Sequence, residues 1–343
     1  MLRFIRSPVV WIGLVVSAGA LFLTFRGLHW AEVREALADA NYALLALAVV
    51  LMPVAFYLRA LRWAVLFYPR RGMSTSNLLG AISVGYALNN LLPLRIGELG
   101  RAYLIGKAEN VNTSHALSTI VVERTLDTLT VVALLMITLP FIDAPAWAKG
   151  PAILVGLAFL GLAVLLAVIS ASRERAMTLV RRVIRFLPER FRERTEQAAD
   201  AAIEGFTVLR RPVTMVQAAA WSAAAWLVSV AIMCVVLRAF DLDVPLTAGI
   251  FVLAATSLGM VVPSSPGYFG VFHAIAISSL VNVFDADRDL ATSYALVQHA
   301  ILYLTPIVVG AVYLWYRRDT WEQVRLWVGG EVPVEETAGT GSS

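Results

Sequence analysis

Long apolar runs are the feature that most constrains how this chain can fold. Six of them are near or above the roughly 20 residues that a membrane-spanning helix needs. Backbone polar groups inside lipid must be hydrogen-bonded within the protein, so isolated runs of this length predict helices. The predicted spans cover residues 8–25, 42–67, 125–142, 151–171, 213–238 and 290–316.

The composition supports an integral membrane protein. Hydrophobic residues make up 59% of the chain and charged residues 15%, against about 45–50% and about 25% in soluble proteins. Residues 8–25 are expected to form an uncleaved first span, because this run exceeds the ~7–15 apolar residues of a signal peptide. A single cysteine, Cys234, excludes an intrachain disulfide. The net charge of +4 does not indicate nucleic-acid binding, because the arginines cluster in loops.

Two further apolar stretches, 77–108 and 246–284, are interrupted by proline and glycine. Arginine-rich loops at 59–76 and 173–211 are predicted to be cytoplasmic, and the acidic loops on the other side to be external. Each interrupted stretch must then enter and leave on one side of the membrane. We therefore predict an all-α polytopic helix bundle of about six full spans plus two re-entrant broken-helix hairpins. The protein is expected in the plasma membrane, with both termini in the cytoplasm.

The two hairpins share a sequence pattern. Pro93-x-x-x-Gly97-x-x-Gly100 matches Pro263-x-x-x-Gly267-x-x-Gly270 at a constant offset. A pattern of eight residues can recur by chance. The alternative is an inverted repeat, which places a site where two broken helices meet near the membrane midplane. The two hairpins are predicted to enter the membrane from opposite sides, and this favours the inverted repeat.

Residues 1–328 are predicted to form one membrane domain, with halves at 8–171 and 213–318. The insert between them, 172–212, contains apolar residues at helical spacing among arginines. It predicts a basic amphipathic helix at the inner membrane surface, and it also serves as a connector between the halves. Residues 329–343 are polar and are expected to be disordered.

Charged residues concentrate around the first hairpin and the start of the next helix. Charge at membrane depth costs several kcal/mol per residue, so it is retained where it lines a cavity or finds a partner. One interpretation is a structural ion-pair network, and the other is a binding site whose arginines hold an anionic head group by forked hydrogen bonds. Asn89 and Asn90 either add donors or cap broken backbone. The charged candidates are Arg95, Glu98, Arg101, Glu123, Arg124 and Asp127.

The second hairpin carries no charge. Ser264, Ser265 and Gly267 suit a tight turn whose exposed amides could attract an anion, and a plain turn is the alternative. His273 and His299 are interpreted as hydrogen-bonded fixtures, because no metal-ligand spacing surrounds them.

Enzyme motifs are absent from the sequence. It contains no G-x-S-x-G, no phosphate-binding loop and no Cys/His cluster. Acidic pairs at 241–243 and 285–287 fall in short loops on the predicted outer face, away from any cytosolic donor. We therefore expect a transporter-like protein without a catalytic residue, cofactor or metal.

Three motifs resemble a known family. They are Asn90-Leu91-Leu92-Pro93 leading into Arg95-x-Gly97-Glu98-x-x-Arg101, then Glu123-Arg124-x-x-Asp127, and later Pro266-Gly267-x-x-Gly270. Together they resemble the transmembrane region of the lysylphosphatidylglycerol synthase family, a group of flippase-like membrane proteins. The resemblance extends over roughly residues 8–318.

This resemblance implies re-entrant helices and the movement of lipid between leaflets. In the best-known members the lipid is an aminoacylated phosphatidylglycerol made by a separate soluble synthase domain, which we expect to be absent here. Other relatives are linked to polyisoprenoid-phosphate glycolipid, hopanoid or cell-envelope pathways, so the resemblance implies a lipid substrate without naming it.

The leading hypothesis is a flippase or transporter of a phospholipid or lipid-linked head group, anionic or zwitterionic. The alternative is a membrane subunit or scaffold of a lipid or polyisoprenoid-phosphate glycolipid synthesis pathway. The expected partners are a membrane lipid, a lipid-synthesis enzyme in the cytosol or membrane, and a second copy of the chain, without nucleic acid.

Overall fold

The computed structural model describes the backbone of residues 29–70, 72–92, 96–142, 172–185, 189–260 and 265–317, with scattered positions in 15–26, 150–164 and 320–325. Every element in this part of the chain is helical, which confirms the all-α prediction. Most of the predicted spans 8–25 and 151–171, and all of the tail 329–343, lie outside the described residues.

Four described stretches are long and apolar enough to cross a membrane. They are α4 (Tyr42–Leu66), α11 (Pro212–Ala239), Pro266–Phe284 and α14 (Arg288–Tyr316). α7 (Thr113–Thr138) has 26 residues, about 39 Å at 1.5 Å per residue, but it carries three charges in its middle. An integral membrane protein with several apolar helices is thus confirmed, while the total number of crossings stays a prediction.

Polar residues at the helix starts fix where these helices begin. The side chain of Asn41 accepts hydrogen bonds from two backbone N–H groups of the first turn of α4. Asp287 does the same for α14, and Asn112 accepts one bond at the start of α7. Each cap satisfies donors that have no partner within the helix.

Both interrupted stretches form pairs of short helices. The first comprises α5 (Thr75–Leu91) and α6 (Gly97–Glu109), and the second comprises α12 (Leu246–Gly259), the 3-10 turn η4 (Pro266–Tyr268) and α13 (Val271–Phe284). α5 packs on α6 and α12 on α13. The predicted breaks are therefore present, and return of each pair to the same membrane face stays a prediction.

Glycine permits the first pair of helices to approach closely. A Cβ atom on Gly97 would lie 2.0 Å from the carbonyl oxygen of Gly85. In the second pair, Gly267 and Gly270 adopt positive φ angles of 72° and 84°, which side chains disfavour. The shared glycines thus serve close packing at one break and turn geometry at the other.

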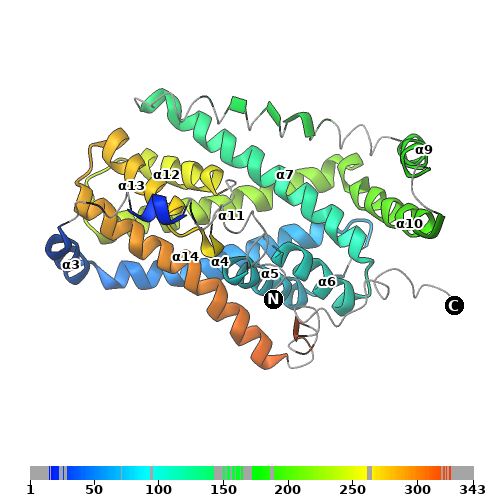
Figure 1. Ribbon diagram of the computed structural model, residues 1–343, viewed down its shortest axis with the longest axis horizontal. Helices are drawn as coiled ribbons and strands as arrows, with labels where there is room; N and C mark the ends of the chain where they lie inside the picture. Colours follow the sequence, from blue (N-terminus) through cyan, green and yellow to red (C-terminus); the bar gives the residue numbers. More distant parts are fainter. Residues whose placement is uncertain are drawn as a thin grey trace.

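The helices pack in a two-fold pattern (Figure 1). α4 packs on α11, while α5 packs on α14 and α12 on α7. α4 and α11 run antiparallel, since the N–H at the start of α4 (Asn41) donates to the carbonyl of Ala239 at the end of α11, over 2.8 Å. If α4 is exchanged with α11, α5 with α12 and α7 with α14, the same three helix–helix contacts result. An inverted repeat produces such a set, because equivalent helices then run in opposite directions.

The polar insert forms α9 (Arg173–Ile184) and α10 (Glu189–Gly205), at the opposite end of the molecule from α3 (Trp30–Asp39) in Figure 1. Ala176, Met177 and Val180 on α9 pack against Ile203 on α10. α10 in turn packs on α7. Part of the apolar face predicted to contact the membrane is therefore covered by the protein, and a membrane-surface location for α9 stays a prediction.

Candidate functional site

An ion-pair network lies between α4, α6, α7 and α11. Its carboxylates come from one face of α7, where Glu123 and Asp127 are one turn apart. Their side chains are 1% and 8% exposed. Two buried carboxylates this close need several cations, and the neighbouring helices supply them.

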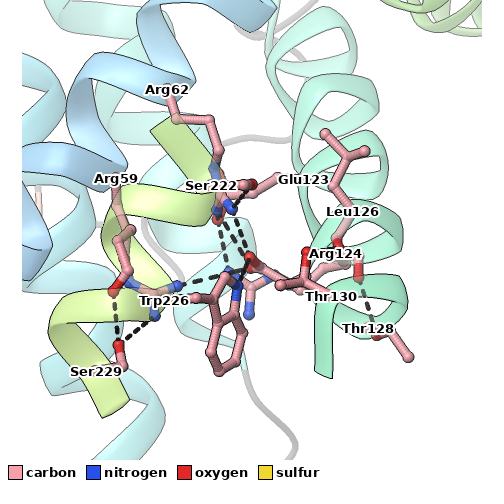
Figure 2. Close-up of polar contacts among 12 residues, drawn as sticks. Arg59, Arg62, Glu123, Arg124, Leu126, Thr128, Thr130, Ser222, Trp226 and Ser229 are labelled. Carbon is pink, nitrogen blue, oxygen red and sulfur yellow. Dashed lines mark hydrogen bonds and ion pairs between the residues drawn. The ribbon is translucent and has the colours of Figure 1, made fainter. Parts of the chain in front are cut away.

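Arg62 on α4 links both carboxylates. Its guanidinium donates to the two oxygens of Asp127, with Nη2 3.2 Å from Oδ2, and it also donates to the Ser222 hydroxyl at 2.8 Å. Nη2 lies 3.2 Å from Oε1 of Glu123. Figure 2 shows this side chain reaching from α4 to Ser222 on α11. Arg62 is fully buried and both of its terminal nitrogens are paired, so we interpret its role as structural.

Arg101 on α6 is the second buried cation. Its Nη2 lies 3.0 Å from Oε2 of Glu123, and its guanidinium lies 4.7 Å from the ring centroid of Trp63. An ion pair and an aromatic face together compensate this buried charge. Arg101 therefore anchors α6 to α7.

Arg124 is shared between three carboxylates. Its Nη2 lies 2.6 Å from Glu123 and 3.3 Å from Asp127, while Nε is 3.8 Å from Glu98. Nη2 also donates to the hydroxyl of Tyr86 at 3.4 Å. Its side chain is 32% exposed, unlike those of the two buried arginines, so it can reach a ligand without leaving the network.

Arg59 is the cation with the weakest contacts in this cluster. Its Nη1 lies 3.7 Å from Oδ2 of Asp127, and its Nη2 donates to the Ser229 hydroxyl at the long distance of 3.5 Å. The guanidinium lies 5.3 Å from the ring of Trp226, whose indole N–H donates to Asp127 at 3.1 Å. Figure 2 shows Arg59 beside Trp226 and Ser229 on α11.

A cavity of about 290 Å³ opens beside this network. Its polar part is formed by Arg59, Asn89, Asn90, Glu98, Arg124 and Asp127. Its apolar part includes Phe56, Leu253, Met260, Phe272, Leu302 and Pro306. Ligand pockets span about 300–1,000 Å³, so this cavity has room for a compact head group but none for whole acyl chains.

The side chains of Asn89 and Asn90 both form hydrogen bonds with backbone groups. The side-chain oxygen of Asn89 accepts from the N–H of Gly97 at 2.8 Å, and the amide of Asn90 donates to the carbonyl of Tyr303 at 3.0 Å. The first bond joins the two sides of the first break, and the second joins α5 to α14. The capping of broken backbone is thus present for Asn89, whereas Asn90 bonds to a carbonyl inside α14, and both residues also line the cavity.

The second hairpin reaches the same cavity through Gly267. The carbonyl of Gly267 lies 2.7 Å from Nε2 of His299. Ser265 lies elsewhere: its N–H donates to the Ser17 hydroxyl at 2.9 Å, and it does not line this cavity. Arg95 and Ser264 fall outside the described residues.

The structure therefore brings most of the predicted residues together in two layers. Glu123 and Arg101 lie in the network, whereas Arg124, Asp127 and Glu98 belong to both the network and the cavity wall. Four described arginines (59, 62, 101 and 124) face three carboxylates (98, 123 and 127), so the network carries one net positive charge. The cavity wall itself holds two arginines and two carboxylates, Arg59 and Arg124 with Glu98 and Asp127.

Sequence reasoning missed the contribution of α4 and α11. The predicted arginine-rich loop 59–76 includes Arg59 and Arg62, but both residues lie within α4. These two arginines therefore do not support the predicted orientation of the chain in the membrane. On α11, the residues missed are Ser222, Trp226 and Ser229. Their i, i+4, i+7 spacing places them on one helix face, which is the signal that could have identified them.

Apolar helices around a charged cavity define an integral membrane protein with a polar-walled cavity between its helices. The chain belongs to the family described as Lysylphosphatidylglycerol synthase TM region, which matches residues 10–310. A UPF0104 membrane protein of Methanothermobacter thermautotrophicus is 27% identical over 290 residues, covering 78% of this chain and 83% of that protein.

A second relative is glycosyltransferase AglD of Haloferax volcanii. It is 25% identical over 347 residues, which cover 90% of this chain and 54% of that protein. The chain thus spans about half the length of this relative.

Proposed function

We propose that this protein moves a lipid between the leaflets of the plasma membrane, with an anionic phosphate-type head group held at Arg59 and Arg124. The observation that carries this proposal is the state of Arg59. It lines the cavity, yet its nearest carboxylate oxygen is 3.7 Å away and its hydroxyl contact is 3.5 Å long. A phosphate oxygen would offer this guanidinium a shorter, charge-assisted bond.

The cavity also suits a lipid in its dimensions and its walls. Its volume accommodates a head group, and its apolar part continues between α12, α13 and α14. The two-fold arrangement of helices supports alternating access, since rocking one half against the other would expose the cavity to each side in turn. The lipid is a phospholipid or a polyisoprenoid-phosphate type, as the family suggests.

A vesicle assay tests this proposal. The full-length protein is reconstituted with phosphatidylethanolamine, phosphatidylglycerol and a fluorescent NBD-phosphatidylglycerol, and dithionite then bleaches the probe in the outer leaflet only. We expect wild-type protein to expose the inner-leaflet probe. Arg59→Gln should slow this movement about 10- to 100-fold, because a hydrogen bond to a charged group contributes about 1.5–3 kcal/mol.

The matched control is Arg181→Gln. Arg181 lies on α9, and its Nε is 2.6 Å from Glu196 in an exposed ion pair far from the cavity. It removes the same charge outside the site and should leave the rate unchanged. Equal rates for wild type and Arg59→Gln would disprove the site, and absence of movement in wild-type vesicles would contradict the proposed function for this class of lipid.

The relationship to glycosyltransferase AglD favours a second candidate, an enzyme or membrane enzyme subunit in a glycolipid pathway. The alignment covers 54% of that protein, so the named activity belongs to a longer chain. Incubating the purified protein with a nucleotide-sugar and a polyisoprenoid phosphate distinguishes the two candidates. Sugar transfer by this chain alone would support an enzyme, and its absence together with lipid movement would support the transporter.

A further inference from the structure

His299 is held in one tautomer at the end of the cavity formed by the second hairpin. Its Nε2 lies 2.7 Å from the carbonyl oxygen of Gly267. A carbonyl only accepts hydrogen bonds, so Nε2 carries the hydrogen and donates it. In a neutral ring the other nitrogen, Nδ1, then has the free lone pair. Among the described residues, Nδ1 has no hydrogen-bond partner.

Aromatic packing fixes the orientation of this ring. Phe272 stacks on it with the ring centroids 5.0 Å apart, and the rings of Phe269 and His273 meet it edge-on at 4.7 and 4.6 Å. His299 is 6% exposed and lines the cavity. The packing leaves the ring little freedom, so Nδ1 keeps a constant position relative to the cavity.

The carboxylates of the network are poorly suited to carry a proton. Asp127 accepts from Arg62 and from the Trp226 indole, and Glu123 is paired with three arginines. Protonating either carboxylate would break several buried ion pairs. Within the described part of the chain, Glu98 pairs with Arg124 at 3.8 Å, which makes it the carboxylate of the network with most freedom. It serves below as the competing candidate.

Among the residues that the structure describes, the other groups around His299 carry no fixed charge. His273 contributes from α13, Tyr268 from η4 and Tyr303 from one turn further along α14, with Tyr86 of α5 on the same cavity. The charged groups in the cavity wall come from α4, α6 and α7: Arg59, Glu98, Arg124 and Asp127. The cavity wall thus contains both the arginines that we propose to bind the head group and the imidazole of His299.

We propose that Nδ1 of His299 takes up a proton from the aqueous phase on one side of the membrane when an anionic head group occupies the cavity, and releases it to the aqueous phase on the other side with the lipid, so that lipid and proton are transported together. This inference rests on the proposed function. A bound anion favours the imidazolium, and a monoanionic head group plus one proton adds no net charge to the moving cavity. Moving an uncompensated charge across a membrane potential involves about 2.3 kcal/mol per 100 mV, which the paired proton removes.

Transport under a pH gradient tests the coupling. NBD-phosphatidylglycerol vesicles carry a gradient of about one pH unit while potassium and valinomycin clamp the membrane potential. One-to-one coupling shifts the distribution of the probe about tenfold per pH unit. We expect wild type to show this shift and His299→Gln to lose it. His115→Gln is the matched control, because His115 is also buried but lies beside Phe67, away from the cavity.

Three results overturn the inference: a wild-type distribution that ignores the gradient, a His299→Gln variant that still responds, or loss of the response in Glu98→Gln alone. The last result would assign the proton to the carboxylate. If wild-type protein moves no probe under any gradient, the proposed function fails for this lipid, and the protonation of His299 is decided by spectroscopy.

That measurement uses the small number of histidines. The chain has four, so 15N-histidine labelling in nanodiscs gives four pairs of ring-nitrogen signals that His→Gln variants assign. In phosphatidylglycerol nanodiscs, we expect the His299 signal to change protonation state between about pH 5 and about pH 8, and Arg59→Gln to reduce this change. A His299 ring that stays neutral throughout this range overturns the inference independently of transport.

Discussion

Arg62 and Asp127 join α4 to α7 through two hydrogen bonds inside the bundle. Replacing Arg62 by alanine would leave the buried carboxylates of Asp127 and Glu123 short of a cation. Removing one partner of a buried ion pair costs about 3–5 kcal/mol. We expect Arg62→Ala to lower the free energy of unfolding by this amount, measured by thermal unfolding of the purified protein in detergent.

An exposed ion pair provides the control for this prediction. Arg181 and Glu196 have side chains that are 63% and 33% exposed, and such pairs contribute about 0–1 kcal/mol. Arg181→Ala should therefore unfold close to the wild-type temperature. Equal stability of the two variants would show that the buried network does not hold the helices together.

At the scale of single residues, the sequence predicted the location of the charged cluster better than it predicted which residues form the cluster. Arg124, Asp127 and Glu98 were identifiable because charge inside an apolar run requires a partner or a cavity. Arg59 and Arg62 were not, because arginines near the end of a span also fit a cytoplasmic loop. Which arginine is buried and paired depends on how α4 packs against α7 and α11, and no periodicity within α4 contains that information.

Among the elements, the first hairpin depends on the contact between Gly85 and Gly97. A methyl group on Gly97 would meet the Gly85 carbonyl at 2.0 Å and the Asn89 side chain at 2.7 Å. Gly97→Ala should push α6 away from α5 and cost about 1–3 kcal/mol, as overpacking does. Thermal unfolding measures the cost, and slower movement of the NBD probe would report the displaced Arg101 and Glu98.

Gly19→Ala is the corresponding control, since a methyl group there meets nothing within 4 Å. It should leave stability unchanged or raise it slightly, because alanine lowers the entropy of the unfolded chain. If Gly97→Ala is equally tolerated, the hairpin is looser than its packing indicates.

The helical elements themselves followed from the sequence to a useful extent. Proline and glycine marked both breaks, and the apolar runs marked α4, α11 and α14. Helix starts at Asn41, Ser74 and Asn112 depend on single capping side chains, which hydrophobicity does not report. Whether a broken pair returns to its own face of the membrane depends on its depth in lipid, which neither apolar content nor helix length specifies.

At the scale of the whole molecule, alternating access requires the two halves to move against each other. α5 belongs to the first half and α14 to the second, and they pack closely: a Cβ atom on Gly310 would lie 3.2 Å from that of Ala87. Disulfides need about 3.5–4.5 Å between Cβ atoms. Cysteines at 87 and 310, in a background with Cys234→Ala, are therefore placed to form a disulfide after a small adjustment.

We expect the oxidised Ala87→Cys/Gly310→Cys protein to stop moving NBD-phosphatidylglycerol, and a reductant to restore the rate. The reduced protein is one control, because it carries both substitutions without the bond, and each single-cysteine variant is a second control, because it carries one substitution and cannot form the bond. The physical reason is that a covalent bond between α5 and α14 fixes one half relative to the other. Undiminished movement in the fully oxidised protein would mean that the α5–α14 contact persists during transport, and that the moving boundary lies elsewhere in the bundle.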